Sequence, residues 1–249
     1  MEAGALQGKV VLVTGGAKRV GAAICRRLHA AGASVLVHYR SSAIEARALQ
    51  VELQSRRADS VVVAQADLLK PASCAQLVKA ALKQLERLDA VVNNASSFFP
   101  TPVGEITEQA WDDLVGTNFK VPLFLAQAAA AALKKSSGLI INIVDIHAMR
   151  PLRDYTVYCS AKAGLHMVTR SLAKELGPEI RVNGISPGPV LWPEQGGDEA
   201  ARRKIIQRTI LQRMGTPEDI ARTALFFAAS APFITGQILA VDGGRSVAW

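Results

Sequence analysis

The chain has 249 residues and a formal net charge of +8, with 49% hydrophobic and 20% charged residues. This balance is typical of a globular protein and excludes a disordered or collagen-like chain. The cysteines Cys25, Cys74 and Cys159 are too few and too widely spaced for a disulfide framework or a C-x-x-C metal site. They favour a reducing compartment, and we expect a cytoplasmic protein.

Membrane, nucleic-acid and metal partners are all disfavoured by the sequence. The N-terminus lacks a signal-peptide pattern, and no uncharged apolar run reaches the roughly 18 residues of a membrane span. The basic charges are scattered and aromatic residues make up only 5% of the chain, which argues for a solvated basic surface rather than a nucleic-acid site. No histidine has metal-ligand spacing with a cysteine or an acidic pair. We expect no membrane, no nucleic acid and no metal.

Apolar runs of strand length alternate with helix-length segments along the whole chain. The runs are rich in Val and Ile and nearly continuous, as in parallel strands buried on both faces. No linker or repeat divides them, so we predict one doubly wound α/β domain of the Rossmann type over residues 1–249, with about seven parallel strands and helices on both faces. The seven runs are Lys9–Thr14, Ser34–Tyr39, Ser60–Ala66, Leu88–Asn93, Leu139–Val144, Arg181–Ile185 and Ile238–Val241.

Three of the intervening segments carry clear helix signals. Val20–Ala31 has apolar residues at helical spacing and is followed by a glycine. Thr156–Leu176 repeats the pattern at greater length and ends at Gly177. Thr216 precedes a proline and two acids, the order of a helix N-terminus.

The first strand leads directly into the glycine-rich segment Thr14–Gly21, and a helix follows. Glycines let the backbone turn sharply and approach a pyrophosphate, which the N-terminus of the next helix attracts. A plain tight turn is the alternative, but the strand before it and the helix after it favour a dinucleotide site.

The end of the second strand indicates which dinucleotide binds. NAD-binding proteins usually place Asp or Glu there for the ribose 2′-hydroxyl. This chain has Arg40, Ser41 and Ser42 instead, and Lys18 and Arg19 lie in the glycine turn. A guanidinium offers charge-assisted, forked donors to a 2′-phosphate, so the sequence favours NADPH over NADH.

Tyr158 and Lys162 are four residues apart near the start of the long helix, and therefore lie on one helix face. An ammonium beside a phenol lowers the phenol pKa toward that of a working general acid. The preceding strand ends at Asp145, and the carboxyl ends of such strands open at the ligand crevice.

These motifs together resemble the short-chain dehydrogenase/reductase family, over essentially the whole chain. The matches are Gly15 and Gly21, Asp67 after the third strand, Asn93-Asn94-Ala95 after the fourth, the Tyr158/Lys162 pair and Pro187-Gly188 after the sixth. Asn118 falls where the family has its structural and proton-relay asparagine. Each motif alone is common, but the combination is highly specific.

Three departures narrow the resemblance. Asp145 stands where the family usually has a catalytic serine, Arg19 replaces the middle glycine of the nucleotide turn, and Ser96 replaces the glycine after Asn-Asn-Ala. This set is similar to the pteridine reductases and the bacterial dihydromonapterin reductases. A carboxylate would repel the oxyanion that develops in a carbonyl reductase, whereas reduction of a C=N bond requires an acid for the nitrogen.

The resemblance implies NADPH as cofactor and a reduced pteridine (dihydrobiopterin, dihydromonapterin or dihydrofolate) as substrate, in a homotetramer. It makes Asp145, Tyr158 and Lys162 catalytic, and places a substrate-binding loop and helix at residues 189–214. The implied substrate contacts are Arg19, Ser96, Phe98 (stacked on the pterin), Asp145, Tyr158 and Trp192. The implied cofactor contacts are Gly15, Lys18, Arg19, Val20, Gly21, Tyr39, Arg40, Ser41, Ser42, Asp67, Leu68, Asn93, Ala95, Ser96, Tyr158, Lys162, Pro187 and Gly188.

Two other functions stay open at this point. One is a general carbonyl or 3-oxoacyl-thioester reductase, and the other is a catalytically silent nucleotide-sensing protein on the same fold. For assembly, the apolar stretches Ala126–Leu133 and Ile220–Phe233 would supply either inter-subunit packing or internal core.

Overall fold

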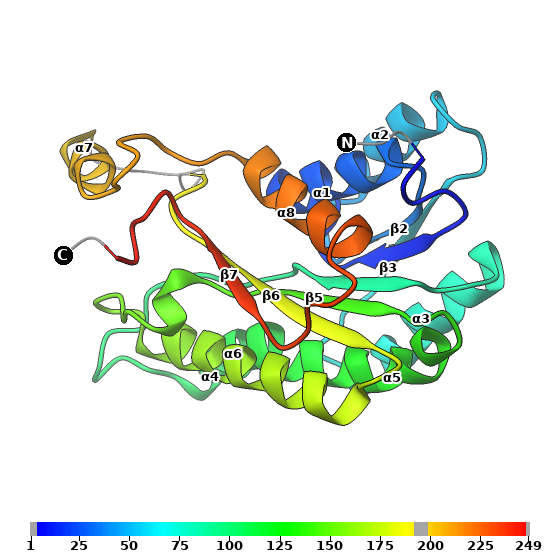
Figure 1. Cartoon of the computed structure of the whole chain (residues 1–249). Helices are drawn as coiled ribbons and strands as arrows, with labels where there is room; N and C mark the ends of the chain where they lie inside the picture. Colours follow the sequence, from blue (N-terminus) through cyan, green and yellow to red (C-terminus); the bar gives the residue numbers. More distant parts are fainter. Residues whose placement is uncertain (1–3, 192–198, 248–249) are drawn as a thin grey trace.

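The computed structural model describes residues 4–191 and 199–247. Seven strands form a parallel sheet in the order β3-β2-β1-β4-β5-β6-β7 (Figure 1). The strands are β1 (Val10–Val13), β2 (Ser34–Tyr39), β3 (Val61–Gln65), β4 (Ala90–Asn93), β5 (Leu139–Ile143), β6 (Arg181–Pro187) and β7 (Ile238–Val241). The predicted doubly wound α/β fold is confirmed, with strand ends within two residues of the predicted ones.

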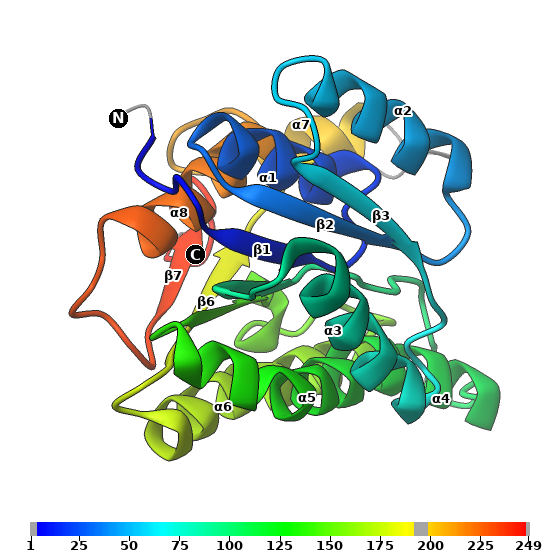
Figure 2. The same ribbon diagram turned by 90° about the vertical axis from the view of Figure 1, so that its right-hand side faces the viewer.

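Helices cover both faces of this sheet, as Figures 1 and 2 show: α1, α2 and α8 lie on one face, and α3, α4, α5 and α6 on the other. Two further short helical turns, η1 and η2, adjoin α5 and β5. The bounds are α1 (Arg19–Ala30), α2 (Ala43–Gln54), α3 (Pro71–Leu85), α4 (Glu108–Val115), η1 (Gly116–Lys120), α5 (Val121–Lys135), η2 (Ile146–Ala148), α6 (Thr156–Leu176), α7 (Glu199–Gln207) and α8 (Pro217–Ala229). None of the helices in the described ranges is long and apolar enough to cross a bilayer.

The sheet separates two apolar cores, because successive side chains of a strand point to opposite faces. In β1, Val11 and Val13 join the core beneath α1 and α8, whereas Val10 and Leu12 join the core beneath α3 and α5. Every residue of β1 and β5 is buried, which explains their continuous apolar sequence.

The two apolar stretches considered for inter-subunit packing are used mostly inside the chain. In α5, Ala126, Ala129 and Leu133 are buried against the sheet. The buried face of α8 likewise runs from Ile220 to Phe227. Phe226 and Phe233 remain exposed, at 40% and 103%, so the internal-core alternative accounts for most but not all of these residues.

Local sequence signals set the ends of the helices that carry the site. Thr216 and Asp219 form a reciprocal capping box at the start of α8, in which each side chain accepts the other residue's backbone N–H. The predicted bounds of α6 match the structure at both ends. A side chain at Gly164 would lie 2.8 Å from the Phe119 ring, so glycine lets α6 pack closely on η1.

Candidate active site

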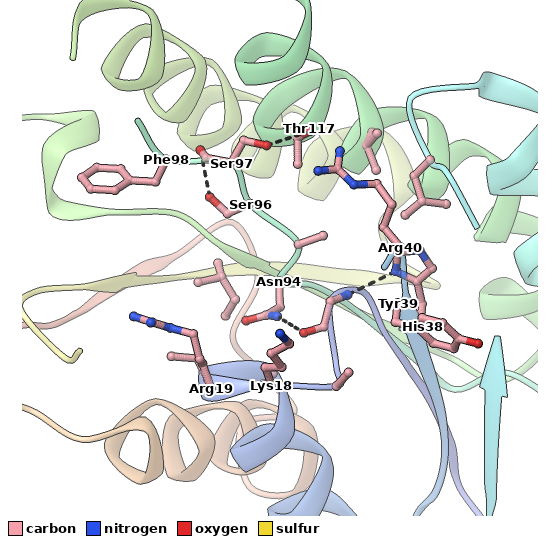
Figure 3. Close-up of a pocket in the computed structure, with 18 of the residues that line it drawn as sticks. Lys18, Arg19, His38, Tyr39, Arg40, Asn94, Ser96, Ser97, Phe98 and Thr117 are labelled. Atoms are coloured by element: carbon pink, nitrogen blue, oxygen red, sulfur yellow. Dashed lines mark hydrogen bonds between the residues drawn. The ribbon is translucent and has the colours of Figure 1, made fainter. Parts of the chain in front are cut away.

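A cavity of about 490 Å³ opens at the carboxyl ends of the strands, around β1 and β4. Chain connections leave β1 and β4 in opposite directions across the sheet, and open α/β sheets bind ligands at such a switch point. Figure 3 shows wall residues from the turn after β1, from β2 and the residue that follows it, and from the segment after β4, with Thr117 from η1. The volume is typical of small-molecule sites.

The glycine turn after β1 is held by the segment after β4. The side-chain nitrogen Nδ2 of Asn94 donates to the carbonyls of Thr14 (2.9 Å) and Gly15 (3.0 Å; Figure 3). The Thr14 hydroxyl oxygen accepts hydrogen bonds from the backbone N–H groups of Asn94 and Ala95. A Cβ at Gly21 would overlap the Gly15 carbonyl oxygen. Only glycine fits there, so the turn stays tight against the start of α1.

His38 supports the same turn from β2. Its Nδ1 accepts the backbone N–H of Gly15 at 3.2 Å, and its Nε2 lies 3.1 Å from the carbonyl oxygen of Ala66. Because a carbonyl only accepts, Nε2 carries the proton and donates it to Ala66. Burial lowers the pKa of His38 below its ordinary value, which favours this neutral form.

Cationic and hydroxyl groups line the wall at the end of β2. Arg40, Ser41 and Ser42 all border the cavity. Lys18 borders it too, but its Nζ forms an ion pair with Glu45 Oε1 at 2.8 Å, which partly neutralises the charge expected there. Arg19 has a φ of 52°, the left-handed conformation, which explains why a glycine suits this position and shows that Arg19 occupies it at a conformational cost.

These features fit a phosphorylated dinucleotide. The first turn of α1 borders the cavity and presents backbone N–H groups and the positive end of the helix dipole to a pyrophosphate. The close approach at Gly15 and Gly21 leaves room for that group next to the backbone. Arg40 with the two serines provides donors for an additional phosphate.

Asp145, Tyr158 and Lys162 meet at the other end of the cavity. The Tyr158 hydroxyl donates to Asp145 Oδ2 at 2.7 Å, and the backbone N–H of His147 donates to Oδ1 at 2.8 Å. The Lys162 ammonium donates to the carbonyl of Ile143 at 2.9 Å and lies 5.7 Å from the centre of the Tyr158 ring. The trio predicted from spacing is thus brought together.

The predicted lowering of the Tyr158 pKa is wrong for this structure. Burial, followed by the negative charge and hydrogen bond of Asp145, raises the pKa of Tyr158 well above its ordinary value. Lys162 does not reverse this, because its ammonium is itself buried and burial lowers its pKa to about 8. The phenol therefore stays protonated, with its proton directed at Asp145.

The segment after β4 adds an aromatic and a hydroxyl to the cavity. One face of Phe98 stacks on Tyr155, with ring centroids 4.5 Å apart and planes 20° apart, and its edge meets Tyr158 at 4.8 Å. A ligand can therefore stack only on the opposite face of Phe98. Ser96 borders the same space, and its hydroxyl donates to Asn118 Oδ1 at 2.6 Å.

Most residues predicted for the site line this cavity, and two do not. Asn93 is buried in β4, where its Nδ2 donates to Asn142 Oδ1, so Asn94 rather than Asn93 faces the site. Gly188 packs against Asp242, because a Cβ there would lie 2.6 Å from Asp242 Cβ. Trp192 lies outside the described residues. The predicted residues that line the cavity are Gly15, Lys18, Arg19, Val20, Gly21, Tyr39, Arg40, Ser41, Ser42, Asp67, Leu68, Ala95, Ser96, Phe98, Asp145, Tyr158, Lys162 and Pro187.

Several wall residues were not predicted. His38 lies within the second predicted strand, and nothing in a buried strand marks its imidazole as a turn support. Tyr155, which is not among the residues that line the cavity, supports the wall from behind, and only the fold stacks it on Phe98. The other unpredicted wall residues are Ala17, Ala66, Leu69, Asn94, Ser97, Thr117, Val121, Ile143 and Val144; of these, Asn94 had a signal in the Asn-Asn-Ala motif.

Comparison with known proteins identifies the family. Residues 15–246 match a family model described as enoyl-(acyl carrier protein) reductase. Pteridine reductase 1 of Leishmania tarentolae is 38% identical, over 96% of both chains, and the short-chain dehydrogenase/reductase FrzI of Cladobotryum sp is 32% identical, over 95% of both. A blue fluorescent protein from a metagenomic library, solved in complex with NADPH, superposes with a TM-score of 0.91 at 37% identity and covers 96% of this chain and 98% of its own. The chain belongs to the short-chain dehydrogenase/reductase family.

Proposed function

We propose that this protein is an NADPH-dependent reductase of pteridines, converting a dihydropteridine such as dihydrobiopterin, dihydromonapterin or dihydrofolate to its tetrahydro form. The observation that carries this proposal is the 2.7 Å hydrogen bond from Tyr158 to the Asp145 carboxylate. Asp145 stands at the position where the family usually has a catalytic serine. We therefore take this carboxylate as the feature that decides which substrate class the site favours.

The chemistry of the substrate explains why an acid suits this position. In a ketone reductase the substrate oxygen becomes negatively charged, and an adjacent carboxylate would oppose that charge. In a pteridine the reduced bond is C=N, and the nitrogen must receive a proton. The Tyr158 hydroxyl carries such a proton and is hydrogen-bonded to the Asp145 carboxylate. We propose that Tyr158 and Asp145 together deliver it.

The cofactor would occupy the wall between the glycine turn and β2. NADPH supplies a hydride when it is bound. The first turn of α1 would hold its pyrophosphate, and Arg40, Ser41 and Ser42 its 2′-phosphate. Lys162, fixed by the Ile143 carbonyl, would hold the nicotinamide end.

The substrate would lie between the cofactor and Phe98. The exposed face of Phe98, opposite Tyr155, offers a stacking surface for a flat heterocycle. Ser96 and Arg19 would contact the edge of the ring. The similarity to pteridine reductase 1 supports this assignment, although the match to an enoyl-(acyl carrier protein) reductase model keeps acyl thioesters as the competing class.

Oxidation of NADPH with three substrates side by side tests the proposal. A dihydropteridine, dihydrofolate and acetoacetyl thioester are compared at equal concentration, with Tyr158→Phe as the background control. We expect turnover with one or both reduced pteridines and little with the thioester. Turnover of the thioester alone would make the protein a 3-oxoacyl reductase, and no turnover of any substrate would favour a nucleotide-sensing role.

We further propose that the protein works in the cytoplasm as a homotetramer. The described cysteines are all free thiols, which suits a reducing compartment. The exposed rings of Phe226 and Phe233 at the end of α8 offer apolar surface for contact between subunits.

A further inference from the structure

The orientation of the Asn118 amide is fixed by two backbone carbonyls. Asn118 lies in the π-helical turn η1 and is 1% exposed. Its Nδ2 donates to the carbonyls of Leu114 and Ser97, both at 2.9 Å. Carbonyl oxygens accept hydrogen bonds and never donate, so the nitrogen must face them and Oδ1 must face the opposite side.

This orientation determines the direction of the Ser96 hydroxyl proton. Asn118 Oδ1 lies 2.6 Å from Ser96 Oγ, and an amide oxygen only accepts, so the hydroxyl proton is donated to Asn118. A second, longer contact of 3.4 Å joins Ser96 Oγ to the Ser97 carbonyl, which also only accepts. With its proton used inside the protein, the Ser96 oxygen presents lone pairs to the cavity that it lines.

Asp145 gives the same wall a second acceptor. Each of its oxygens already accepts one hydrogen bond, Oδ1 from His147 and Oδ2 from Tyr158, and each retains a further acceptor position. Apart from the ring nitrogen that receives the proton from Tyr158, a ligand edge that carries only acceptors would place lone pairs against the lone pairs of Ser96 and Asp145 here. An edge with N–H or NH₂ groups would satisfy them.

We propose that Asn118 is a positioning residue that makes Ser96 an acceptor, so that the wall formed with Asp145 selects ligands whose ring edge carries N–H or NH₂ donors. This inference rests on the proposed function and specifies its substrate class as an amino-bearing, nitrogen-rich heterocycle. It also gives the π-helical turn between α4 and α5 a role in specificity, through the side chain it buries.

A pair of ligands that differ in hydrogen-bond polarity tests this inference. We would measure by calorimetry the Kd of 2,4-diaminopteridine, whose amino groups donate, and of 2,4-dimethoxypteridine, whose ether oxygens only accept. The ratio of the two Kd values is compared between the wild type and Asn118→Ala, both with NADP⁺ present. We expect Asn118→Ala to reduce the preference for the diamino ligand by about tenfold, because Ser96 is then free to donate. The size difference between the ligands affects both proteins equally and leaves this change intact.

Two further variants separate polarity from folding. Ser96→Ala removes the acceptor but keeps the hydrogen bonds of Asn118 Nδ2 to Leu114 and Ser97, and we expect it to reduce the same preference by a similar factor. Thr107→Ala removes the N-cap of α4, whose hydroxyl accepts the N–H of Ala110, and so weakens the neighbouring helix outside the cavity. It should lower the melting temperature and leave the ratio of Kd values unchanged.

The outcomes distinguish this inference from the proposed function. If both pteridines bind and neither Asn118→Ala nor Ser96→Ala changes the ratio, the inference is wrong and the proposed function stands. If no pteridine binds the wild type, the proposed function and the substrate class fall together. A neutron structure of the ligand-free wild type then still decides the polarity: a Ser96 deuteron directed at Asn118 Oδ1 supports it, and one directed into the cavity overturns it.

Discussion

Replacing Asp145 by Asn reverses the direction of one hydrogen bond and leaves the shape of the site unchanged. The carboxylate now accepts from His147 N–H and from the Tyr158 hydroxyl. An amide has one accepting and one donating end, and the donating end cannot face the His147 N–H. The Asn oxygen will therefore pair with His147, and its NH₂ group will donate to the Tyr158 oxygen.

This reversal removes the acceptor that orients the Tyr158 proton. General acid–base catalysis contributes about 10²–10⁴-fold to a rate, so we expect dihydropteridine reduction to fall by that factor, or about 3–5 kcal/mol of transition-state stabilisation. Asp145→Ser should lose as much. Affinity for NADPH should change little, because in the proposed site the glycine turn and Lys162 hold the cofactor and neither is altered.

The pH dependence gives an independent readout. The Asp145 charge contributes to the raised pKa of Tyr158, so removing the charge must lower that pKa. The alkaline limb of the pH–rate profile should therefore move to lower pH in Asp145→Asn. Asp154→Asn is the matched control, since Asp154 is exposed, lies four residues before Tyr158 and is an acid of the same length.

Steady-state kinetics across pH with a dihydropteridine, together with the Kd for NADPH, completes the assay. Undiminished turnover in Asp145→Asn would show that Asp145 is only a structural acceptor at the end of β5. The carbonyl-reductase function would then regain support. A loss of NADPH affinity as large as the loss of rate would instead indicate a disrupted cofactor site.

Four other predictions follow from the same structure. Arg40→Asp should lower kcat/KM for NADPH far more than kcat/KM for NADH, by about 1.5–3 kcal/mol for a lost charged contact. Equal kcat/KM for both cofactors in the wild type would contradict this prediction. Arg47→Asp, on the exposed side of α2, is the control for the change in net charge. Gly21→Ala should lower the free energy of unfolding in urea by about 1–3 kcal/mol, because the added Cβ overlaps the Gly15 carbonyl. Gly215→Ala is the control, since a Cβ there has ordinary contacts, and it should leave the free energy of unfolding nearly unchanged. Burial lowers the pKa of His38 in the folded protein, so as the pH falls the unfolded chain binds a proton at this histidine first. The contribution of His38 to stability is therefore complete above about pH 6.5 and is lost as the pH falls through the folded-state pKa. Melting temperatures measured from neutral to acidic pH should fall less steeply in His38→Asn than in the wild type. Light scattering at micromolar concentration should give about four times 26.5 kDa, and a monomer would refute the tetramer.

The fold was predictable because its signals are local and repeated. Runs such as Leu139–Val144 are continuous in Val and Ile, since both faces of β5 are buried. The bounds of α6 followed from Gly177-Pro178 at one end and helical spacing before it. The glycine turn was equally clear, because only glycine is tolerated at Gly21.

The parts of the site that were not predictable depend on contacts between distant segments. The stacking of Phe98 on Tyr155 and the Ser96–Asn118 hydrogen bond join residues that no spacing rule connects. The pKa of Tyr158 was predicted with the wrong sign, because its neighbour Lys162 is visible in the sequence while burial is not.

The left-handed backbone of Arg19 also matters for anyone who engineers this protein. An L-residue in that conformation costs about 1 kcal/mol relative to glycine, so Arg19→Gly should raise the melting temperature. A design that restores the glycine of the family pattern described above would make that substitution. It would then gain robustness by deleting a cation from the cavity wall. If Arg19 contacts substrate and cofactor as proposed, position 19 is one where selection for stability and selection for turnover point to different amino acids.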